Sequence, residues 1–231
     1  MSLQPPTIVL FDMDGTTVRH INPLLLHILE RLDDAAFKIT QLFSRLFRRK
    51  IDRIPLVEFR NGKRPKLLVH RAMHKIRRKD VDEIVEPCPG IYAILDFLKE
   101  NNVRMGLASN GLGKGYGHDI LKTFDLEKYY EVTLFREDIT RSKPHPDPIL
   151  TALTRMANPP TDKDVVWYIG DRRKDILAAI AARNHLPCPI IPIAYGLNSA
   201  VAVLEQNVGV ENIVMAWPDL EIKLRNLLKK H

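Results

Sequence analysis

Cysteine is scarce in this sequence: Cys88 and Cys188 are the only two among 231 residues, and they are 100 residues apart. This usage excludes a small fold held together by disulfides and is typical of a reducing compartment, so we expect a cytoplasmic protein. Long apolar runs are also missing, because the longest are far shorter than the roughly 18 residues that a membrane-spanning helix needs. The first residues, MSLQPPTIVLFDMD, lack the basic stretch that opens a signal peptide. We therefore expect neither a membrane span nor a signal peptide.

Aromatic residues are few and charge is unevenly distributed. Residues 18–86 contain 17 Lys and Arg against 9 Asp and Glu, whereas the rest of the chain has 18 against 19. A basic segment on a neutral body indicates a local surface for anions or simply a solvated face. Aromatic residues make up only 7% of the chain, which gives little capacity for base stacking, so we expect no nucleic-acid partner.

What is present is the composition of a globular protein, 45% hydrophobic and 27% charged, in a chain long enough for one full domain and a smaller insertion. Short, buried-type strands alternate with amphipathic helices. Strands are predicted over residues 7–11, 103–108, 132–135, 165–169 and 190–194, and helices over 90–100, 146–156, 175–183 and 218–228. This alternation predicts an α/β fold with a doubly wound, mainly parallel, Rossmann-like sheet, whose ligand site lies at the carboxyl ends of the strands.

Residues 18–86 interrupt the alternation. Asn22 and Pro23 are suited to begin a helix, as its cap and first residue. Leucine and other apolar residues then recur at helical spacing for about 25 residues, and a second, strongly basic helical stretch covers about 65–79. We predict an α-helical cap domain over 18–86, inserted into a Rossmann-like core of residues 1–17 and 87–231. The apolar face of its first helix leaves open a homodimer formed through this segment.

Two acidic pairs follow predicted strands. Asp12 and Asp14 come directly after the first strand, where residues two apart point to the same side of an extended chain. Two such carboxylates need either a cation between them or a shared proton, so a metal site and an acid/base pair are both open. Asp171 and Asp175 follow the strand at 165–169, and oxygen-rich sites of this kind suit Mg²⁺. Asp175 is equally suited to stabilise the beginning of a helix.

Two further elements carry groups that favour phosphate. Ser109 and Asn110 follow the strand at 103–108, where a hydroxyl and backbone amides form a phosphate cradle or, more simply, a turn. Lys143 lies in Ser142-Lys143-Pro144, where proline stiffens the backbone around a single cation. A fixed ammonium beside carboxylates would neutralise both them and an incoming phosphate.

Taken in chain order, DMDGT, LASN, SKP and GDRRKD resemble the haloacid dehalogenase-like hydrolase superfamily. The similarity is greatest to its phosphatases with a helical cap after the first motif, such as phosphoglycolate phosphatases. The resemblance implies a Mg²⁺-dependent hydrolase of a small phosphomonoester, with an aspartyl-phosphate intermediate and a small anionic phosphorylated metabolite as its substrate. It also implies that Asp12 is the nucleophile and Asp14 the general acid/base.

The remaining roles implied by the resemblance concern the phosphate and the metal. Ser109 and the Asn110 amide would bind the transferring phosphoryl group, and Lys143 would steady both nucleophile and phosphate. Asp171 would complete the Mg²⁺ site with Asp12, with Asp175 in support, and Asp14 would contribute its backbone carbonyl.

The sequence departs from the usual family pattern at two places. Thr17-Val18-Arg19-His20 replaces the common Leu and Asp-Ser, and Arg172 replaces a frequent Ser after Gly-Asp. Neither change removes a catalytic group. Two other functions stay open: a phosphoryl transferase or mutase of the same superfamily, and a binding protein that recruits an acidic partner through its basic cap.

Overall fold

The computed structural model describes residues 3–21 and 81–228. Contacts divide the chain into two compact units, residues 1–19 with 85–231 and residues 20–84. In the second unit, the described residues include the short 3-10 helix η1 (Val81–Glu83), and the Ile21 N–H donates a hydrogen bond to the Ile84 carbonyl. The predicted helices of the inserted segment lie at residues outside the described ranges, so the helical cap over 18–86 stays a prediction.

A six-stranded parallel sheet forms the first unit, in the order β5-β4-β1-β6-β7-β8. These strands are β1 (Ile8–Phe11), β4 (Arg104–Ala108), β5 (Val132–Leu134), β6 (Val166–Gly170), β7 (Ile190–Tyr195) and β8 (Ile213–Val214). A separate two-stranded sheet pairs β2 (Val18–His20) with β3 (Val85–Pro87). The prediction of a doubly wound, mainly parallel sheet is confirmed.

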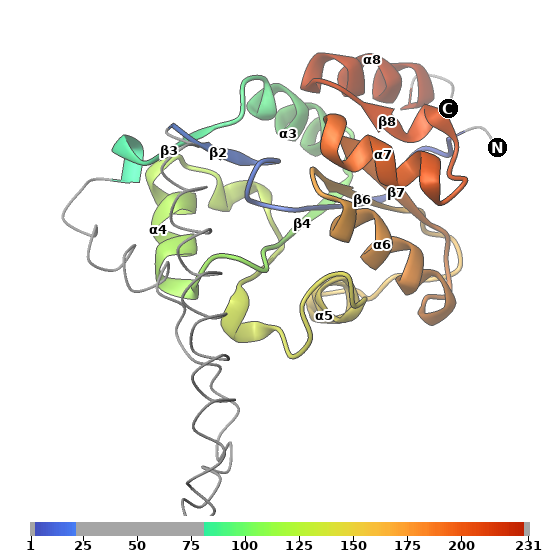
Figure 1. Ribbon diagram of the computed structural model, residues 1–231, viewed down its shortest axis with the longest axis horizontal. Helices are drawn as coiled ribbons and strands as arrows, with labels where there is room; N and C mark the ends of the chain where they lie inside the picture. The colour runs from blue at the N-terminus through green and yellow to red at the C-terminus, as the bar shows by residue number, and fades with distance from the viewer. Residues whose placement is uncertain (1–2, 22–80, 229–231) are drawn as a thin grey trace, which may run out of the picture. The chain divides into compact units, whose positions relative to one another are not determined.

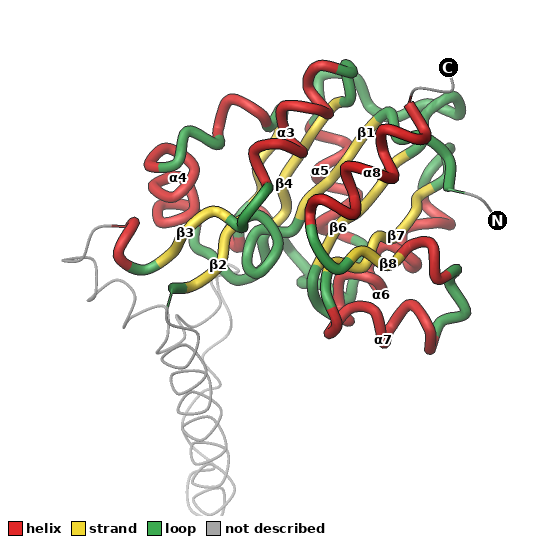
Figure 2. The backbone as a smooth tube through the Cα atoms, turned by 90° about the horizontal axis from the view of Figure 1, so that it is seen from above, coloured by secondary structure: helices red, strands yellow, loops and turns green. Residues whose placement is uncertain are grey.

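Helices cover both faces of the large sheet, with α3 and α8 on one side and α5 and α6 on the other (Figure 1, Figure 2). The helices are α3 (Ile91–Glu100), α4 (Lys114–Thr123), α5 (Asp147–Arg155), α6 (Arg173–Ala182), α7 (Leu197–Glu205) and α8 (Trp217–Leu228). None of the helices in the described ranges has both the length and the apolar character that crossing a membrane requires.

Successive side chains of the central strand β1 point to opposite faces of the sheet, which explains why helices pack on both faces. Ile8 and Leu10 of β1 point to one face and belong to the core cluster that includes Ile149 of α5. Phe11 points to the other face, where its ring centroid lies 6.0 Å from that of Trp217 in α8. Helices bury both faces of β1, so the strand is fully enclosed. The residues that follow its end therefore have a well-defined position.

The strand order reverses direction beside β1, and ligands commonly bind at such a point in a parallel sheet. From β1 the chain runs to β4 and β5 on one side, then crosses to β6 and β7 on the other. At such a switch point the loops after neighbouring strands diverge, which leaves room for a ligand at the carboxyl edge. The loops after β1, β4 and β6 carry most of the predicted site residues.

Helix α4 packs unusually closely against the chain segment after β5. A Cβ added at Gly117 would collide with the fully buried ring of Phe135, whereas a Cβ at Gly115 would meet nothing within 4 Å. Although both glycines lie in the same helix, the packing requires glycine at position 117 and not at position 115.

This contrast predicts opposite effects of the same substitution. We expect Gly117→Ala to lower the free energy of unfolding by about 1–3 kcal/mol, because the new methyl overpacks the core. Gly115→Ala should leave this free energy unchanged or raise it by up to about 1 kcal/mol, because alanine is the better helix former. Urea unfolding of both variants measures the difference, and equal effects would show that α4 does not approach Phe135 as described.

Candidate active site

The loop after β1 turns sharply and places its backbone against the end of β6. Gly15 has a φ of 82°, in the left-handed region that favours glycine, and the Met13 carbonyl accepts hydrogen bonds from the N–H groups of Thr17 and Val18, both at 3.0 Å. A Cβ on Gly15 would collide with the Asp171 carboxylate. The turn therefore brings Asp12 and Asp171 together, as their positions after neighbouring strands predict.

Lys143 lies at the centre of the site, and its side chain is completely buried. Its ammonium donates hydrogen bonds to Asp12 Oδ1, to the Ala108 carbonyl at 3.2 Å and to the Tyr168 hydroxyl at 2.8 Å. It also forms an ion pair with Asp175 Oδ1 at 2.7 Å. One cation thus joins the ends of β1 and β4 and the middle of β6 to helix α6.

Asp175 stabilises the beginning of a helix, as its sequence position suggested, and also pairs with Lys143. One carboxylate oxygen accepts the Arg172 N–H at 3.0 Å, which satisfies a backbone donor at the beginning of α6. The other forms the ion pair with Lys143. Its helix-capping hydrogen bond therefore fixes the carboxylate that faces the site.

The titration of the site is governed by burial and by its mixture of charges. Burial, assisted by Asp175 and Asp14, raises the pKa of Asp12 to about 6, although Lys143 opposes the rise. Burial and the charges of Asp12 and Asp175 raise the pKa of Asp171 to about 7. Burial works against the charge of Lys143, but Asp12 and Asp175 hold its pKa well above the ordinary value. The carboxylates outnumber the cation, so the site favours additional positive charge.

The acidic cluster fits a divalent cation. Asp12, Asp171 and Asp175 each offer a carboxylate oxygen, and these oxygens lie within 4.8 Å of one another. Asp171 Oδ1 is buried and has no hydrogen-bond partner among the described residues, an uncommon arrangement that a cation would explain. Hard oxygen ligands of this kind suit Mg²⁺. The side chain of Asp14 is not part of this group.

Ser109 and Asn110 follow β4 and lie beside Lys143. Ser109 is buried, and its hydroxyl oxygen accepts the Leu112 N–H at 3.3 Å, which leaves its own O–H as a donor. The Asn110 amide donates to the Lys143 carbonyl at 3.5 Å. Next to them, a Cβ at Gly111 would lie 2.9 Å from Asp14 Oδ2. The loop after β4 therefore lies against both Lys143 and Asp14, and all seven predicted site residues belong to one region.

Two functional contacts were not predicted from the sequence. Tyr168, in the middle of the apolar strand β6, accepts a hydrogen bond from Lys143, and Thr17 donates one to the Asp12 carbonyl at 2.9 Å. The hydroxyl of buried Tyr130 lies 3.5 Å from that of Thr17. Thr17 stands where the family commonly has Leu, so this departure adds a hydrogen bond that orients the Asp12 backbone.

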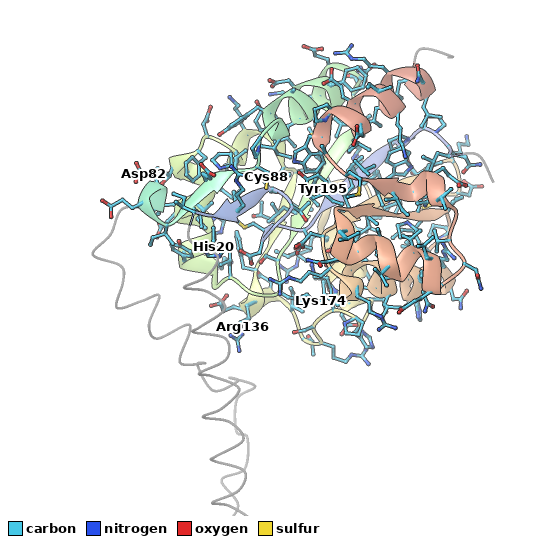
Figure 3. The ribbon with its side chains drawn as sticks, turned by 45° about the horizontal axis from the view of Figure 1, so that its top comes forward. His20, Asp82, Cys88, Arg136, Lys174 and Tyr195 are labelled. Atoms are coloured by element: carbon cyan, nitrogen blue, oxygen red, sulfur yellow. The ribbon has the colours of Figure 1, made fainter. Side chains whose placement is uncertain are left out.

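Basic side chains also stand near this edge of the sheet. Arg136 lies two residues after the end of β5, and Lys174 is in the first turn of α6, after β6 (Figure 3). Both are partly exposed. Because the carboxyl ends of parallel strands lie at one edge, these residues add positive potential on the side where an anionic ligand would enter.

Comparisons with known proteins identify a matching family. The family model for haloacid dehalogenase-like hydrolases matches residues 9–185. The phosphoglycolate phosphatase of Escherichia coli (strain K12) is 32% identical over 137 residues, which cover 58% of this chain and 51% of that protein. The chain thus spans about half the length of the phosphoglycolate phosphatase that it matches.

Solved structures share the fold at lower sequence identity. A haloacid dehalogenase-superfamily hydrolase from Ehrlichia chaffeensis has a TM-score of 0.60 and 22% identity, covering 98% of this chain and 100% of its own. A candidate β-phosphoglucomutase from Thermotoga maritima also has a TM-score of 0.60 and 22% identity, covering 93% and 97%. At these identities the similarity shows the fold alone.

The acidic cluster predicts that Mg²⁺ stabilises the folded protein. At about ten times its dissociation constant, Mg²⁺ should raise the free energy of unfolding by roughly 1.4 kcal/mol and the melting temperature by about 3–6 °C relative to EDTA. Asp171→Asn should remove most of this increase, because it deletes a carboxylate from the cluster. Differential scanning calorimetry with and without Mg²⁺ measures the effect.

Asp162→Asn is the matched control, since Asp162 is an exposed aspartate in the loop before β6. It should retain the full increase in melting temperature with Mg²⁺. A wild-type protein whose melting temperature is the same in Mg²⁺ and in EDTA would contradict the assignment of the cluster.

Proposed function

The chain belongs to the haloacid dehalogenase-like hydrolase family, and from that premise we propose that it is a phosphatase that hydrolyses a small phosphomonoester. The observation that carries the proposal is the buried contact of Lys143 with Asp12, two residues before a second carboxylate, Asp14. The ammonium compensates for charge repulsion between a carboxylate nucleophile and a phosphate dianion. A related phosphoglycolate phosphatase with 32% identity supports the same reaction type.

In this proposal Asp12 attacks the phosphorus, and the bond between phosphorus and the ester oxygen breaks. Asp14 donates a proton to the departing alkoxide, which leaves as an alcohol. The product is an aspartyl-phosphate on Asp12, so one difficult displacement is divided into two easier ones. Asp14 then removes a proton from water, which attacks the phosphorus and releases inorganic phosphate from Asp12.

The other residues bind and orient the phosphoryl group. Ser109 has an O–H to donate to a phosphoryl oxygen, with the backbone amide of Asn110 beside it. Lys143 stabilises the negative charge that moves between the carboxylate and the phosphoryl oxygens. Its contacts with Ala108 and Tyr168 hold the ammonium in place, so little reorganisation is needed during the reaction.

Mg²⁺ is the proposed cofactor, held by Asp12 and Asp171, with Asp175 in support and the Asp14 backbone carbonyl as a further ligand. When bound, it would supply positive charge that neutralises the phosphoryl oxygens. The raised pKa values of Asp12 and Asp171 support this choice, because both carboxyls lack sufficient compensating charge in the protein alone.

The presence of Asp14 favours phosphate over other substrates of the superfamily. The dehalogenases to which the sequence is similar have no acidic residue at this place, because halide needs no proton on leaving. An alkoxide does need one, so Asp14 has a purpose only in phosphoryl transfer. A mutase reaction would also use it, but the similarity to a candidate β-phosphoglucomutase, at 22% identity, shows the fold alone and does not favour that reaction.

We also propose that the protein acts on a small anionic metabolite in the cytoplasm. Cys88 and Cys188 are both free and buried, which supports a reducing compartment. The alternative of a binding protein that recruits an acidic partner does not account for the buried arrangement of Lys143 and three carboxylates. Dimerisation through residues 18–86 lies outside the described residues and stays a prediction.

Substitution of the two leading carboxylates separates their roles. Asp12→Asn should reduce phosphatase activity by at least about 10³-fold and prevent phosphoenzyme formation, because it removes the nucleophile. Asp14→Asn should lower kcat for alkyl phosphates by about 10²–10⁴-fold, because they need a proton donor. Its effect on the first step with aryl phosphates should be smaller, since phenolates leave more readily.

Phosphate release and acid-quench mass spectrometry measure these effects. In the Asp14→Asn variant incubated with an aryl phosphate, a phosphorylated peptide should map to Asp12. Asp162→Asn, remote from the site, serves as the control with unchanged turnover. Phosphorylation of any other residue, or full activity of Asp12→Asn, would contradict the proposed mechanism.

A further inference from the structure

The hydroxyl of Tyr130 reaches the candidate nucleophile through Thr17. Tyr130 directly follows the 3-10 helix η2 (Glu127–Tyr129), and its hydroxyl oxygen lies 3.5 Å from Thr17 Oγ1. Both side chains are buried. Within the described ranges, the Tyr130 hydroxyl has no other hydrogen-bond partner. A buried hydroxyl needs a partner, because leaving it unpaired costs free energy, and Thr17 supplies that partner.

The hydrogen bonds of this contact can run in one direction only. The Asp12 carbonyl has no proton to give, so its hydrogen bond of 2.9 Å with Thr17 uses the proton of the Thr17 hydroxyl. Thr17 Oγ1 must then accept from Tyr130. Burial raises the pKa of the Tyr130 hydroxyl above its ordinary value, so the phenol keeps its proton at neutral pH. Two hydrogen bonds thus run in series, from Tyr130 to Thr17 and from Thr17 to Asp12.

The ring of Tyr130 packs on the residue that precedes Asp12. Its centroid lies 6.0 Å from that of Phe11, with an interplanar angle of 66°, which is a favourable edge-to-face arrangement. Phe11 is the last residue of β1 and is fully buried, so this packing fixes the Tyr130 ring and the direction of its hydroxyl. Tyr130 therefore contacts the residue before Asp12 and, through Thr17, the carbonyl of Asp12 itself.

Both polar groups of the Asp12 backbone have a partner. The N–H donates to the Ile169 carbonyl at 2.8 Å, and the carbonyl accepts from Thr17. The backbone determines where the carboxylate stands relative to a bound phosphorus, and a misplacement of about 1 Å can lower a rate by about 10²-fold. Lys143 holds the carboxylate directly. Loss of the carbonyl contact should therefore displace the nucleophile only slightly and reduce the rate without abolishing it.

We propose that Tyr130 is a positioning residue for the nucleophile and acts through Thr17. Its hydrogen bond directs the Thr17 proton to the Asp12 carbonyl, which fixes the backbone from which the carboxylate attacks. The inference rests on the proposed phosphatase function and deepens it by assigning a role to a residue outside the four family motifs. It also explains why a hydroxyl at position 17 matters, since an apolar residue there could not accept from Tyr130.

The test is a double-mutant cycle with Thr17→Val and Tyr130→Phe, which remove the two hydroxyls and nearly keep the side-chain shapes. With an aryl phosphate and Mg²⁺, Tyr130→Phe should lower kcat and kcat/KM together by about 3- to 10-fold, as expected for a buried neutral hydrogen bond. KM should not change, because the groups proposed to bind phosphate are untouched. Thr17→Val should lower kcat at least as much. Adding Tyr130→Phe to it should lower kcat no further, because Tyr130 acts through Thr17.

Thermal stability distinguishes positioning from a merely structural role. In Thr17→Val the Tyr130 hydroxyl stays buried without a partner, so the melting temperature should fall. Adding Tyr130→Phe removes this unpaired group and should restore part of the melting temperature. A positioning role predicts that kcat stays low in the double variant while the melting temperature rises. A structural role predicts that both rise together.

Tyr129→Phe is the matched control, because Tyr129 is the neighbouring buried tyrosine and its hydroxyl donates to Asp96 of α3 at 2.6 Å. Its kcat should equal that of the wild type. Three results would overturn the inference and leave the phosphatase function intact: an unchanged kcat in Tyr130→Phe, additive losses in the double variant, or a kcat that recovers with the melting temperature. A wild-type protein that hydrolyses no aryl phosphate would instead overturn the proposed function, and the inference with it.

Discussion

The buried ammonium of Lys143 is the interaction on which the site depends. It contacts Asp12 after β1, the Ala108 carbonyl in β4, Tyr168 in β6 and Asp175 in α6. Removing one partner from a buried ion pair typically costs about 3–5 kcal/mol, because the other charge is left uncompensated. The Lys143 contacts therefore couple the stability of the fold to the geometry of the candidate nucleophile.

Much of the fold could be predicted because its strands are buried on both faces. β1, β4, β5, β6 and β7 all appear as short apolar runs, and the structure moves their predicted ends by only one residue. Helix α4 escaped prediction because its sequence, KGYGHDILKT, has two glycines and a weak apolar face, and close packing on Phe135 determines it instead. Helix α7, LNSAVAVLE, has an unbroken run of five apolar residues and no clear helical period, and β8 has only two residues.

The candidate site was predictable wherever a polar residue follows an apolar strand. Asp12, Ser109 and Asp171 all have this position, and a parallel sheet brings such residues to one edge. Tyr168 was missed, because it lies within an apolar strand and the direction of its hydroxyl depends on tertiary packing. The available signal was weak: a tyrosine two residues before Gly170-Asp171.

The two departures from the family pattern change how the candidate catalytic residues are held in place, and they leave the reactive groups themselves unchanged. Thr17 replaces an apolar residue, yet its methyl group is buried with the core while its hydroxyl holds the Asp12 carbonyl. Arg172 replaces a small residue, and its backbone N–H still donates a hydrogen bond to the Asp175 carboxylate, a contact that any side chain at position 172 would allow. Because both contacts involve the backbone of the site, the sequence could vary at these positions while Asp12 and Asp175 kept their places around Lys143.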